Sequence, residues 1–269
     1  MVTMLGYQVP SFWGAMRRQR QVLAAILLRT IRTRFFGHGT GYLVAVGWPV
    51  AHILLLIAIF TIGGRSAPFG ESAVLFVATG SVPFMVFSYL SRFMMVDLLA
   101  NRPLLGLPEV KLLDVLIASA VLEILSAFTV AIIMIILGWF FGVPLAPQDM
   151  AEAFGAILAA ILLGLGVGVL NSVIMMVFQM WMTGYMLLNV AVWASSGVMF
   201  VPSAIPDPFR TWLSYNPALQ VVEWMRAAYY EGYGEHLLDR TYTIGFGVVA
   251  LAVGLILERL LRGHVLSMR

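Results

Sequence analysis

Long apolar stretches, separated by short segments rich in polar residues, glycine or proline, fill the chain from residue 42 onward. Each stretch is close to the roughly 20 residues that a helix needs to cross a bilayer core. We therefore predict an all-α integral membrane protein with six transmembrane helices. The predicted spans are 42–61, 72–93, 113–138, 153–177, 184–202 and 242–257, and residues 1–41 precede them as an N-terminal segment.

The N-terminal segment shows a helical repeat of apolar and basic residues over positions 11–36. The apolar positions that share one face are Leu23, Ile26, Leu27 and Ile31. The arginines of the opposite face include Arg18, Arg29 and Arg32. Such two-faced helices are typical of membrane interfaces. We predict an amphipathic interface helix here, followed by a turn toward the bilayer in the glycine-rich residues 37–41.

A polar and aromatic segment separates the last two apolar stretches. In it, Asp207-Pro208 and Asn216-Pro217 each place an acceptor side chain at a helix N-cap and a proline at the first helical position. We predict short helices over 208–215 and 217–231. At about 1.5 Å per residue they reach about 12 and 22 Å, too short to cross a membrane. They are expected to form an amphipathic or re-entrant pair on one face of the bilayer.

Composition excludes a soluble domain. Hydrophobic residues make up 61% of the 269 positions and charged residues 11%, with a mean hydropathy of +0.94, whereas soluble domains carry about 25% charged residues. The chain has no cysteine, which excludes disulfides, thiolate metal sites and cysteine nucleophiles. Its four histidines are too scattered for a metal-binding motif.

The basic residues indicate the orientation of the spans, because loops that stay in the cytoplasm carry an excess of Lys and Arg. With both termini in the cytoplasm, twelve of the sixteen Lys and Arg residues lie inside, Arg92 among them. The four outside are Arg65, Arg210, Arg226 and Arg240. We therefore predict cytoplasmic termini and place the two short helices on the outer face. Topology explains the pI of about 9.4 better than nucleic-acid binding does.

The sequence contains no P-loop of its own, since the pattern G-x-x-x-x-G-K-[ST] is absent and Lys111 is the single lysine. If ATP drives this protein, the ATPase is a separate subunit that docks on the cytoplasmic side. The loop 97–111 is the docking candidate, because exposed leucines at this density are typical of a contact surface. They are Leu98, Leu99, Leu104, Leu105 and Leu107. Alternatively, the loop lies in the interface beneath the N-terminal helix.

Two ionisable side chains fall inside predicted spans, His52 in the first and Glu123 in the third. Such residues are rare in membranes and often functional. Glu123 is either the proton carrier of a proton-coupled transporter or a structural group, neutral or hydrogen-bonded to a neighbouring span. The same structural interpretation is open for His52. In the fourth span, Gly164 and Gly168 predict close helix packing rather than a nucleotide site, because no strand precedes them.

The outer segment is rich in aromatic residues, among them Trp212, Tyr215, Trp224, Tyr229 and Tyr230. One interpretation is anchoring, since Trp and Tyr gather at membrane interfaces. The other is an outer gate whose aromatic faces line an exit path and stack on sugar rings. On the second short helix, Glu223 and Arg226 lie three positions apart, where we predict a surface ion pair worth about 0.2–0.5 kcal/mol.

Three stretches resemble the permease subunits of ABC-2 type exporters, and most closely the capsular polysaccharide export permeases. They are the arginine-rich amphipathic N-terminus, the loop Asn101-Arg102-x-Leu104-Leu105 running to Val110-Lys111, and Tyr215-Asn216-Pro217-Ala218-Leu219 leading to Glu223-Trp224-x-Arg226. The resemblance implies a homodimer of six-span permease domains, here residues 42–269, in a bacterial inner membrane. Two copies of a separate ATPase would hold ATP and Mg. Lipid-linked polysaccharide would leave between the protomers toward periplasmic and outer-membrane export components.

The resemblance also assigns roles to residues. The ATPase coupling contact would include Asn101, Arg102, Pro103, Leu104, Leu105, Glu109 and Lys111. The periplasmic gate and its sugar contacts, on a re-entrant helix pair, would include Trp212, Tyr215, Asn216, Pro217, Glu223, Trp224, Arg226, Tyr229 and Tyr230. Anionic cargo or lipid would meet Arg29, Arg32 and Arg92.

Two alternatives stay open at this point. One is an ABC-2 exporter of another cargo, such as O-antigen, teichoic acid or a drug. The other is a proton-coupled carrier that uses Glu123. In each case no catalytic residue, cofactor, metal or nucleic-acid partner is expected of this chain.

Overall fold

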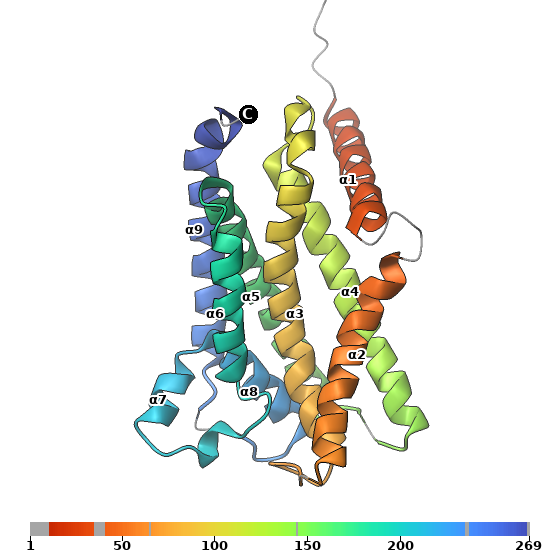
Figure 1. Cartoon of the computed structure of the whole chain (residues 1–269), viewed down its shortest axis with the longest axis vertical. Coiled ribbons are helices and arrows are strands. Elements are labelled where there is room, and N and C mark those ends of the chain that lie inside the picture. Colours follow the sequence, from red (N-terminus) through yellow and green to blue (C-terminus); the bar gives the residue numbers. More distant parts are fainter. Residues whose placement is uncertain (1–10, 35–40, 65, 144, 235–236, 268–269) are drawn as a thin grey trace, which may run out of the picture.

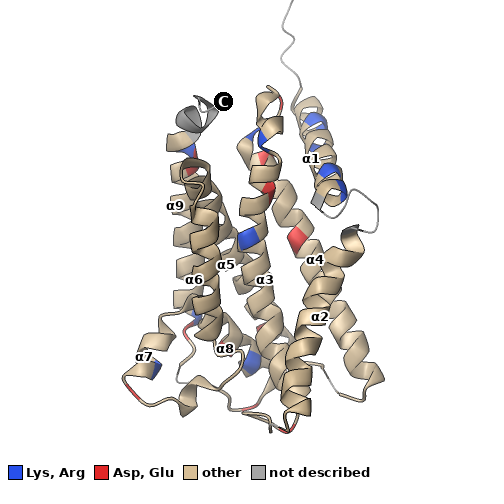
Figure 2. Cartoon of the chain, viewed as in Figure 1, with Lys and Arg blue, Asp and Glu red and all other residues tan. Residues whose placement is uncertain are grey.

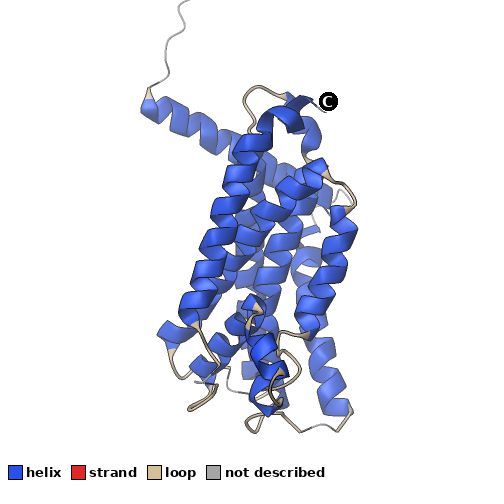
Figure 3. Cartoon of the chain, turned by 90° about the vertical axis from the view of Figure 1, so that its left-hand side faces the viewer, coloured by secondary structure: helices blue, strands red, loops and turns tan. Residues whose placement is uncertain are grey.

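The computed structural model describes residues 11–34, 41–64, 66–143, 145–234 and 237–267. All regular elements in these ranges are helices (Figure 3). The α-helices are α1 (Phe12–Arg34), α2 (Gly41–Ile62), α3 (Ala73–Ala100), α4 (Leu112–Phe140), α5 (Met150–Val177), α6 (Trp181–Ala194), α7 (Phe209–Ser214), α8 (Pro217–Tyr229) and α9 (Arg240–Ser267). Short 3₁₀ turns cover Arg102–Gly106 and Pro202–Ala204. The all-α prediction is confirmed for this part of the chain.

Among the described residues, five helices are long and apolar enough to cross a membrane, namely α2, α3, α4, α5 and α9. Their qualifying segments contain 21 to 29 residues, and about 20 suffice for a bilayer core. They coincide with predicted spans one to four and six. The main difference is that α3 continues to Ala100 instead of ending near residue 93.

The helix predicted over 184–202 is corrected by the structure. Its helix, α6, has 14 residues, which at about 1.5 Å per residue gives about 21 Å, short of a full crossing. It ends shortly before Gly197, which has a φ of 76°, a left-handed conformation that glycine adopts without a steric penalty and that does not continue a right-handed helix.

The helices form an elongated bundle with two different ends (Figure 1). α1 and the last turns of α9 lie at one end, called here the α1 end, while α7 and α8 lie at the opposite end, the α8 end. α6 runs beside the long helices and leads the chain from the α1 end to the α8 end. Basic residues line α1 at the α1 end (Figure 2). The first and last described helices therefore share one end of the bundle.

Glycines of α5 let three helices pack closely. A Cβ added to Gly168 would lie 2.6 Å from the Met94 sulfur of α3, and Gly164 approaches α3 in the same way. One added to Gly166 would lie 2.5 Å from the Gly247 carbonyl oxygen of α9. A Cβ at Gly166 would meet backbone atoms, whereas at Gly164 and Gly168 it would press on the Leu90 and Met94 side chains. The packing role predicted for Gly164 and Gly168 is confirmed.

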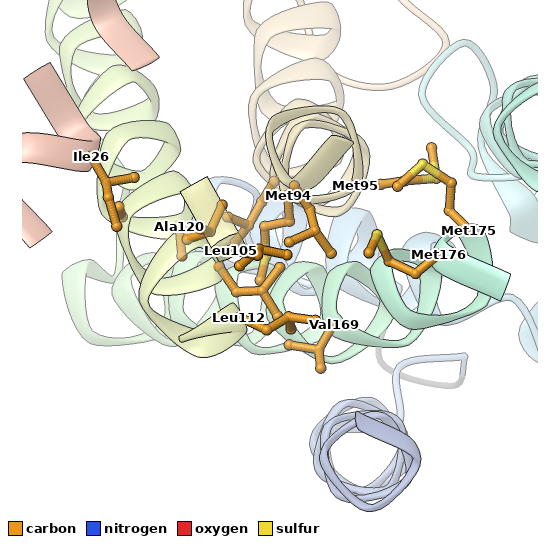
Figure 4. Packing of buried hydrophobic residues seen from close by; sticks show 14 of the residues in the cluster. Ile26, Met94, Met95, Leu105, Leu112, Ala120, Val169, Met175 and Met176 are labelled. Atoms are coloured by element: carbon orange, nitrogen blue, oxygen red, sulfur yellow. The ribbon is translucent and has the colours of Figure 1, made fainter. Parts of the chain in front are cut away.

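A hydrophobic cluster fills the bundle toward the α1 end (Figure 4). Met94 and Met95 of α3 meet Met175 and Met176 of α5 in this cluster. Ile26 of α1 joins it and is only 2% exposed. The apolar face predicted for α1 is thus packed on the bundle, and α4 is its main neighbour.

Candidate functional site

Helix α8 begins as its sequence predicts and is tied at once to α6. The side-chain oxygen of Asn216 accepts a hydrogen bond from the Ala218 N–H at 2.9 Å, with Pro217 at the first helical position. The Asn216 amide nitrogen donates to the Val192 carbonyl at 3.0 Å and to the Ser195 hydroxyl at 2.9 Å. Asn216 therefore both caps α8 and fastens it to the end of α6.

The matching N-cap predicted at Asp207 does not form. Its carboxylate accepts hydrogen bonds from the side chains of Arg210 and Thr211, and α7 has no side-chain cap. The Arg210 guanidinium thus binds the Asp207 carboxylate, which would otherwise accept hydrogen bonds from backbone N–H groups at the start of the helix. Trp212 and Tyr215, at or next to this short helix, are 64% and 67% exposed.

Arg226 of α8 is completely buried and binds the turn that follows α6. Its Nη1 donates to the Gly197 carbonyl at 2.7 Å and the Phe200 carbonyl at 3.2 Å, and its Nη2 donates to the Val198 carbonyl at 2.9 Å. The guanidinium carbon lies 3.8 Å from the centre of the Phe76 ring of α3. A planar fork with several donors suits this task. Arg226 therefore binds three carbonyl groups of the turn that follows α6 and holds that turn against α8.

Glu223 completes this buried cluster. Its carboxylate accepts a hydrogen bond from the Tyr233 hydroxyl at 2.9 Å and lies 3.7 Å from Arg226 Nη1. The surface ion pair predicted for Glu223 and Arg226 is corrected, because both side chains are buried. Burial raises the pKa of the Glu223 carboxyl group, while Arg226 and Tyr233 act in the opposite direction. Burial also raises the pKa of the Tyr233 hydroxyl group.

The remaining predicted gate aromatics fasten α8 to its surroundings. The Trp224 indole donates to the Glu152 carboxylate at the start of α5. The Tyr229 hydroxyl donates to the Leu145 carbonyl at 3.1 Å, and the Tyr230 ring lies 5.3 Å from the Phe69 ring. These three residues are therefore structural contacts in this conformation, unlike the exposed Trp212 and Tyr215.

Gln220 is a member of this site that the sequence analysis missed. It is 1% exposed. Its amide nitrogen donates to the Ser214 carbonyl at 2.8 Å, and its amide oxygen accepts from the Asp239 N–H at 2.8 Å. The sequence feature that could have identified Gln220 is its position as a single amide residue among the apolar residues of a short helix. Gln220 links α7, α8 and the start of α9, so α8 connects most elements of this end.

At the α1 end, hydrogen bonds hold the loop 101–111 against α1. Asn101 is 2% exposed, and its amide donates to the Asp97 carbonyl at 2.9 Å and to the Thr30 hydroxyl of α1 at 3.3 Å. Asp114 accepts from the Gln19 side chain of α1 and from the Lys111 N–H, the latter at 2.9 Å. The loop therefore lies beside the N-terminal helix, as the alternative interpretation of this segment expected.

A groove of about 630 Å³ remains between α1 and residues 104–110. Its lining includes Arg18, Arg29, Leu104, Leu107 and Glu109. The predicted leucine-rich exposed loop is corrected, because Leu98 and Leu105 are buried in the core and Leu98 belongs to α3. Leu99 and Leu107 are the exposed leucines of the five. Of the other predicted coupling residues, Arg102 is half-buried, whereas Pro103 and Lys111 are exposed. Arg32 lies exposed on α1.

The other predicted polar positions line cavities between the helices. His52 and Arg92 line one cavity of about 490 Å³ between α2, α3 and α6. The expectation that Arg92 belongs to the cytoplasmic surface is corrected, because α3 continues for two more turns beyond it. Glu123 of α4 is 5% exposed and lines a neighbouring small cavity that shares Tyr89 with the first.

The fold and these contacts define a polytopic α-helical membrane protein. No family profile matches the chain. It is 32% identical over 242 residues to the polysialic acid transport protein KpsM of Escherichia coli, with 90% of this chain and 93% of KpsM covered. It is 24% identical over 224 residues to the capsule polysaccharide export inner-membrane protein CtrC of Neisseria meningitidis serogroup B, with 82% and 83% covered. The chain belongs to the family of capsule polysaccharide export permeases, the ABC-2 type membrane proteins that its sequence resembles.

Proposed function

We propose that this chain is the transmembrane subunit of an ATP-driven exporter that moves capsular polysaccharide, linked to a lipid, across the bacterial inner membrane. The observation that carries the proposal is the 32% identity to a polysialic acid transport protein over nine-tenths of the chain. The groove at the α1 end supports it, because a chain without a P-loop needs a surface on which a separate ATPase can act.

In this proposal, two copies of an ATPase bind ATP and Mg and dock in the groove between α1 and residues 104–110. The exposed positions offered to that partner are Pro103, Leu107, Glu109 and Lys111. Buried Asn101 and Asp114 connect the loop to α1. A force applied to the loop therefore acts on α1, α3 and α4 together.

The α1 end faces the cytoplasm in this proposal, and the chain makes a sixth crossing through α6, which is too short by itself and is extended by the turn 195–200. α7 and α8 then form the outer re-entrant pair, with Arg226 holding α8 against the turn. The excess of arginine near the termini supports this orientation.

We predict that a reporter enzyme active only in the periplasm is active when fused after Gly232 and silent after Gly106. The reverse pattern would contradict the orientation.

A homodimer is the proposed assembly, with the polymer passing between protomers. Exposed apolar side chains on α2 and α6 support it, among them Leu43, Trp48, Leu187 and Val190. Exposed apolar side chains in such numbers are covered either by lipid or by a second copy of the chain. Periplasmic and outer-membrane components are the proposed partners beyond the inner membrane.

Deletion of the gene in its own host tests the function. The expected result is loss of surface polysaccharide, with lipid-linked polymer retained inside the cells, and recovery when the chain is supplied again. Polymer is quantified separately at the surface and in lysates. Normal surface polysaccharide in the deletion strain would rule out the proposal.

Replacement of Glu123 with glutamine tests the proton-carrier alternative. We expect export to stay near the wild-type rate, because glutamine keeps the hydrogen-bonding shape of a protonated carboxyl group and an ATP-driven exporter has no need of its proton. Surface polysaccharide per cell is the measurement, normalised to the amount of permease in the membrane. Loss of export with normal abundance would favour the carrier.

A further inference from the structure

A second large cavity lies toward the α8 end, between α3, α4, α5 and α8. Its volume is about 530 Å³, within the range of roughly 300–1,000 Å³ usual for ligand sites. Each of the four helices contributes to its walls, as does the loop between α4 and α5. Examples are Thr79, Ala131, Ala153, Tyr229 and Leu145. The functions proposed above make no use of this cavity.

The walls of this cavity are apolar. Among the described residues that line it, none is charged, and the hydroxyl groups belong to Thr79 and Tyr229. The Thr79 hydroxyl donates to the Leu75 carbonyl at 2.8 Å, and the Tyr229 hydroxyl donates to the Leu145 carbonyl at 3.1 Å. Because both hydroxyl groups already bind the backbone, the walls offer an occupant apolar contacts rather than hydrogen bonds.

A space of this size and chemistry suits a hydrocarbon. Protein interiors contain few voids larger than a water molecule, and water does not fill an apolar cavity, because it finds no hydrogen-bond partners there. Met134, Met150 and Met225 all line the walls. Methionine side chains are flexible and adapt to occupants of irregular shape. The cavity therefore favours a flexible apolar chain over water or a polar ligand.

The mouth of the cavity lies between α4 and α5. Both helices pack on α3, but they make little contact with each other, and α4 leans away from the bundle toward the α8 end (Figure 1). Phe128 and Ile135 of α4 and Phe154 of α5 line the cavity and are also exposed. Because α4 and α5 are both long and apolar enough to cross a membrane, this mouth faces the acyl chains of the bilayer.

We propose that this cavity is a binding site for one acyl chain of a phospholipid, which enters from the bilayer between α4 and α5. The chain fills the space beside Met225 and Tyr229 and so supports α8, the helix whose Arg226 binds the turn 195–200. In the proposed orientation the lipid belongs to the outer leaflet. The inference goes beyond the export function, because the site requires no particular cargo.

The test is photolabelling of the purified chain in phosphatidylethanolamine nanodiscs, with its ATPase if that subunit co-purifies. The protein comes from a host that makes no capsular polymer, and a small fraction of the lipid carries a diazirine at the end of one acyl chain. Mass spectrometry then locates the labelled residues. We expect label on α8, at Met225 or Tyr229, in addition to exposed positions such as Leu125. Every residue of α8 is buried or half-buried, so label confined to exposed positions would overturn the proposal.

Variants that fill the cavity make the test specific. Ala131→Phe should lower the ratio of α8 label to Leu125 label about tenfold, which corresponds to about 1.4 kcal/mol and lies within the cost of overpacking a filled site. Ala153→Phe fills the cavity from α5 and should act alike, so the result does not depend on the folding of one variant. Ile132→Phe is the matched control, because Ile132 is the next residue of α4 but is exposed and does not line the cavity. Undiminished α8 label in both filling variants would contradict the site.

Two other occupants of the cavity or its mouth would give different results. Lipid-linked polymer added to the nanodiscs should leave the α8 label in place. Loss of the label at a molar ratio where extra phospholipid has no effect would assign the cavity to the anchor of the cargo and overturn the proposal. Because the chain contains no cysteine, Phe154→Cys detects a second copy at the mouth by disulfide formation. We expect no disulfide, and a cross-linked dimer without α8 label would overturn the lipid site. These measurements do not involve export, so their failure leaves the export function in place.

Discussion

Replacing Arg226 with methionine is expected to lower the free energy of unfolding by about 3–5 kcal/mol, the usual cost of removing one member of a buried charge pair. Methionine keeps part of the apolar stem but donates no hydrogen bond. The Gly197, Val198 and Phe200 carbonyl groups then lose their hydrogen bonds from the guanidinium, and buried Glu223 loses its neighbouring cation. Unfolding of the purified protein by SDS, followed by circular dichroism, measures the change.

Two variants make this prediction specific. Arg210→Met removes an arginine that also lies three positions from an acid, Asp207, but at the exposed surface. Surface ion pairs are worth about 0–1 kcal/mol, so this variant should lose no more than that in free energy of unfolding. Glu223→Gln should cost less than Arg226→Met, because glutamine keeps an acceptor for the Tyr233 hydroxyl group and leaves the contacts of Arg226 with the carbonyl groups in place. Equal losses for Glu223→Gln and Arg226→Met would mean that the ion pair, rather than the carbonyl contacts, holds the turn.

Elements that depend on local patterns were predicted well from the sequence. The long apolar stretches became α2 to α5 and α9, because span length and hydropathy are properties of the stretch itself. The Asn216-Pro217 cap formed for the same reason. The cap at Asp207 failed because Arg210, one turn further on, binds the carboxylate. Local signals were thus reliable only where no nearby side chain competed for the same acceptor.

The errors at the candidate sites came from partners distant in the sequence. The i, i+3 spacing of Glu223 and Arg226 suggested a surface pair, but the carbonyl groups that bury Arg226 lie 26 to 29 positions earlier. Arg92 was counted with the cytoplasmic cations because span two was predicted to end near residue 93, one position further on. Its helix continues to Ala100 instead, and the guanidinium is held by the rings of Tyr89 and Phe93.

Contacts within the bundle give a physical route between its two ends. α3 and α5 pack along each other and both contact α8. α3 also leads directly into the loop that α1 binds through Asn101 and Thr30. We expect a displacement of that loop to move α3 and α5 as one unit, because the glycines of α5 let it pack closely against α3. The same two helices contact both α8 and the elements beside the proposed ATPase groove.

Replacing Leu107 with aspartate is expected to abolish export and to reduce the ATPase recovered with the purified chain at least tenfold. Leu107 is 52% exposed and lines the groove between α1 and residues 104–110. Burying an unpaired carboxylate in a protein contact costs several kcal/mol, and about 1.4 kcal/mol already corresponds to a tenfold loss of affinity. Because the side chain points to solvent in the isolated subunit, the stability and abundance of the permease should not change. Co-purification from membranes, with the ATPase quantified per permease, is the measurement.

Leu99→Asp is the matched control for this prediction. Leu99 is an exposed leucine on the last turn of α3, at the same end of the bundle, but it does not line the groove. Its variant should retain the ATPase and export polymer. Equal loss of the ATPase in both variants would show that the contact extends over the whole α1 end. If Leu107→Asp retained all of its ATPase, the groove would not be where the ATPase docks. A carboxylate buried in that contact would lose its water and weaken the binding.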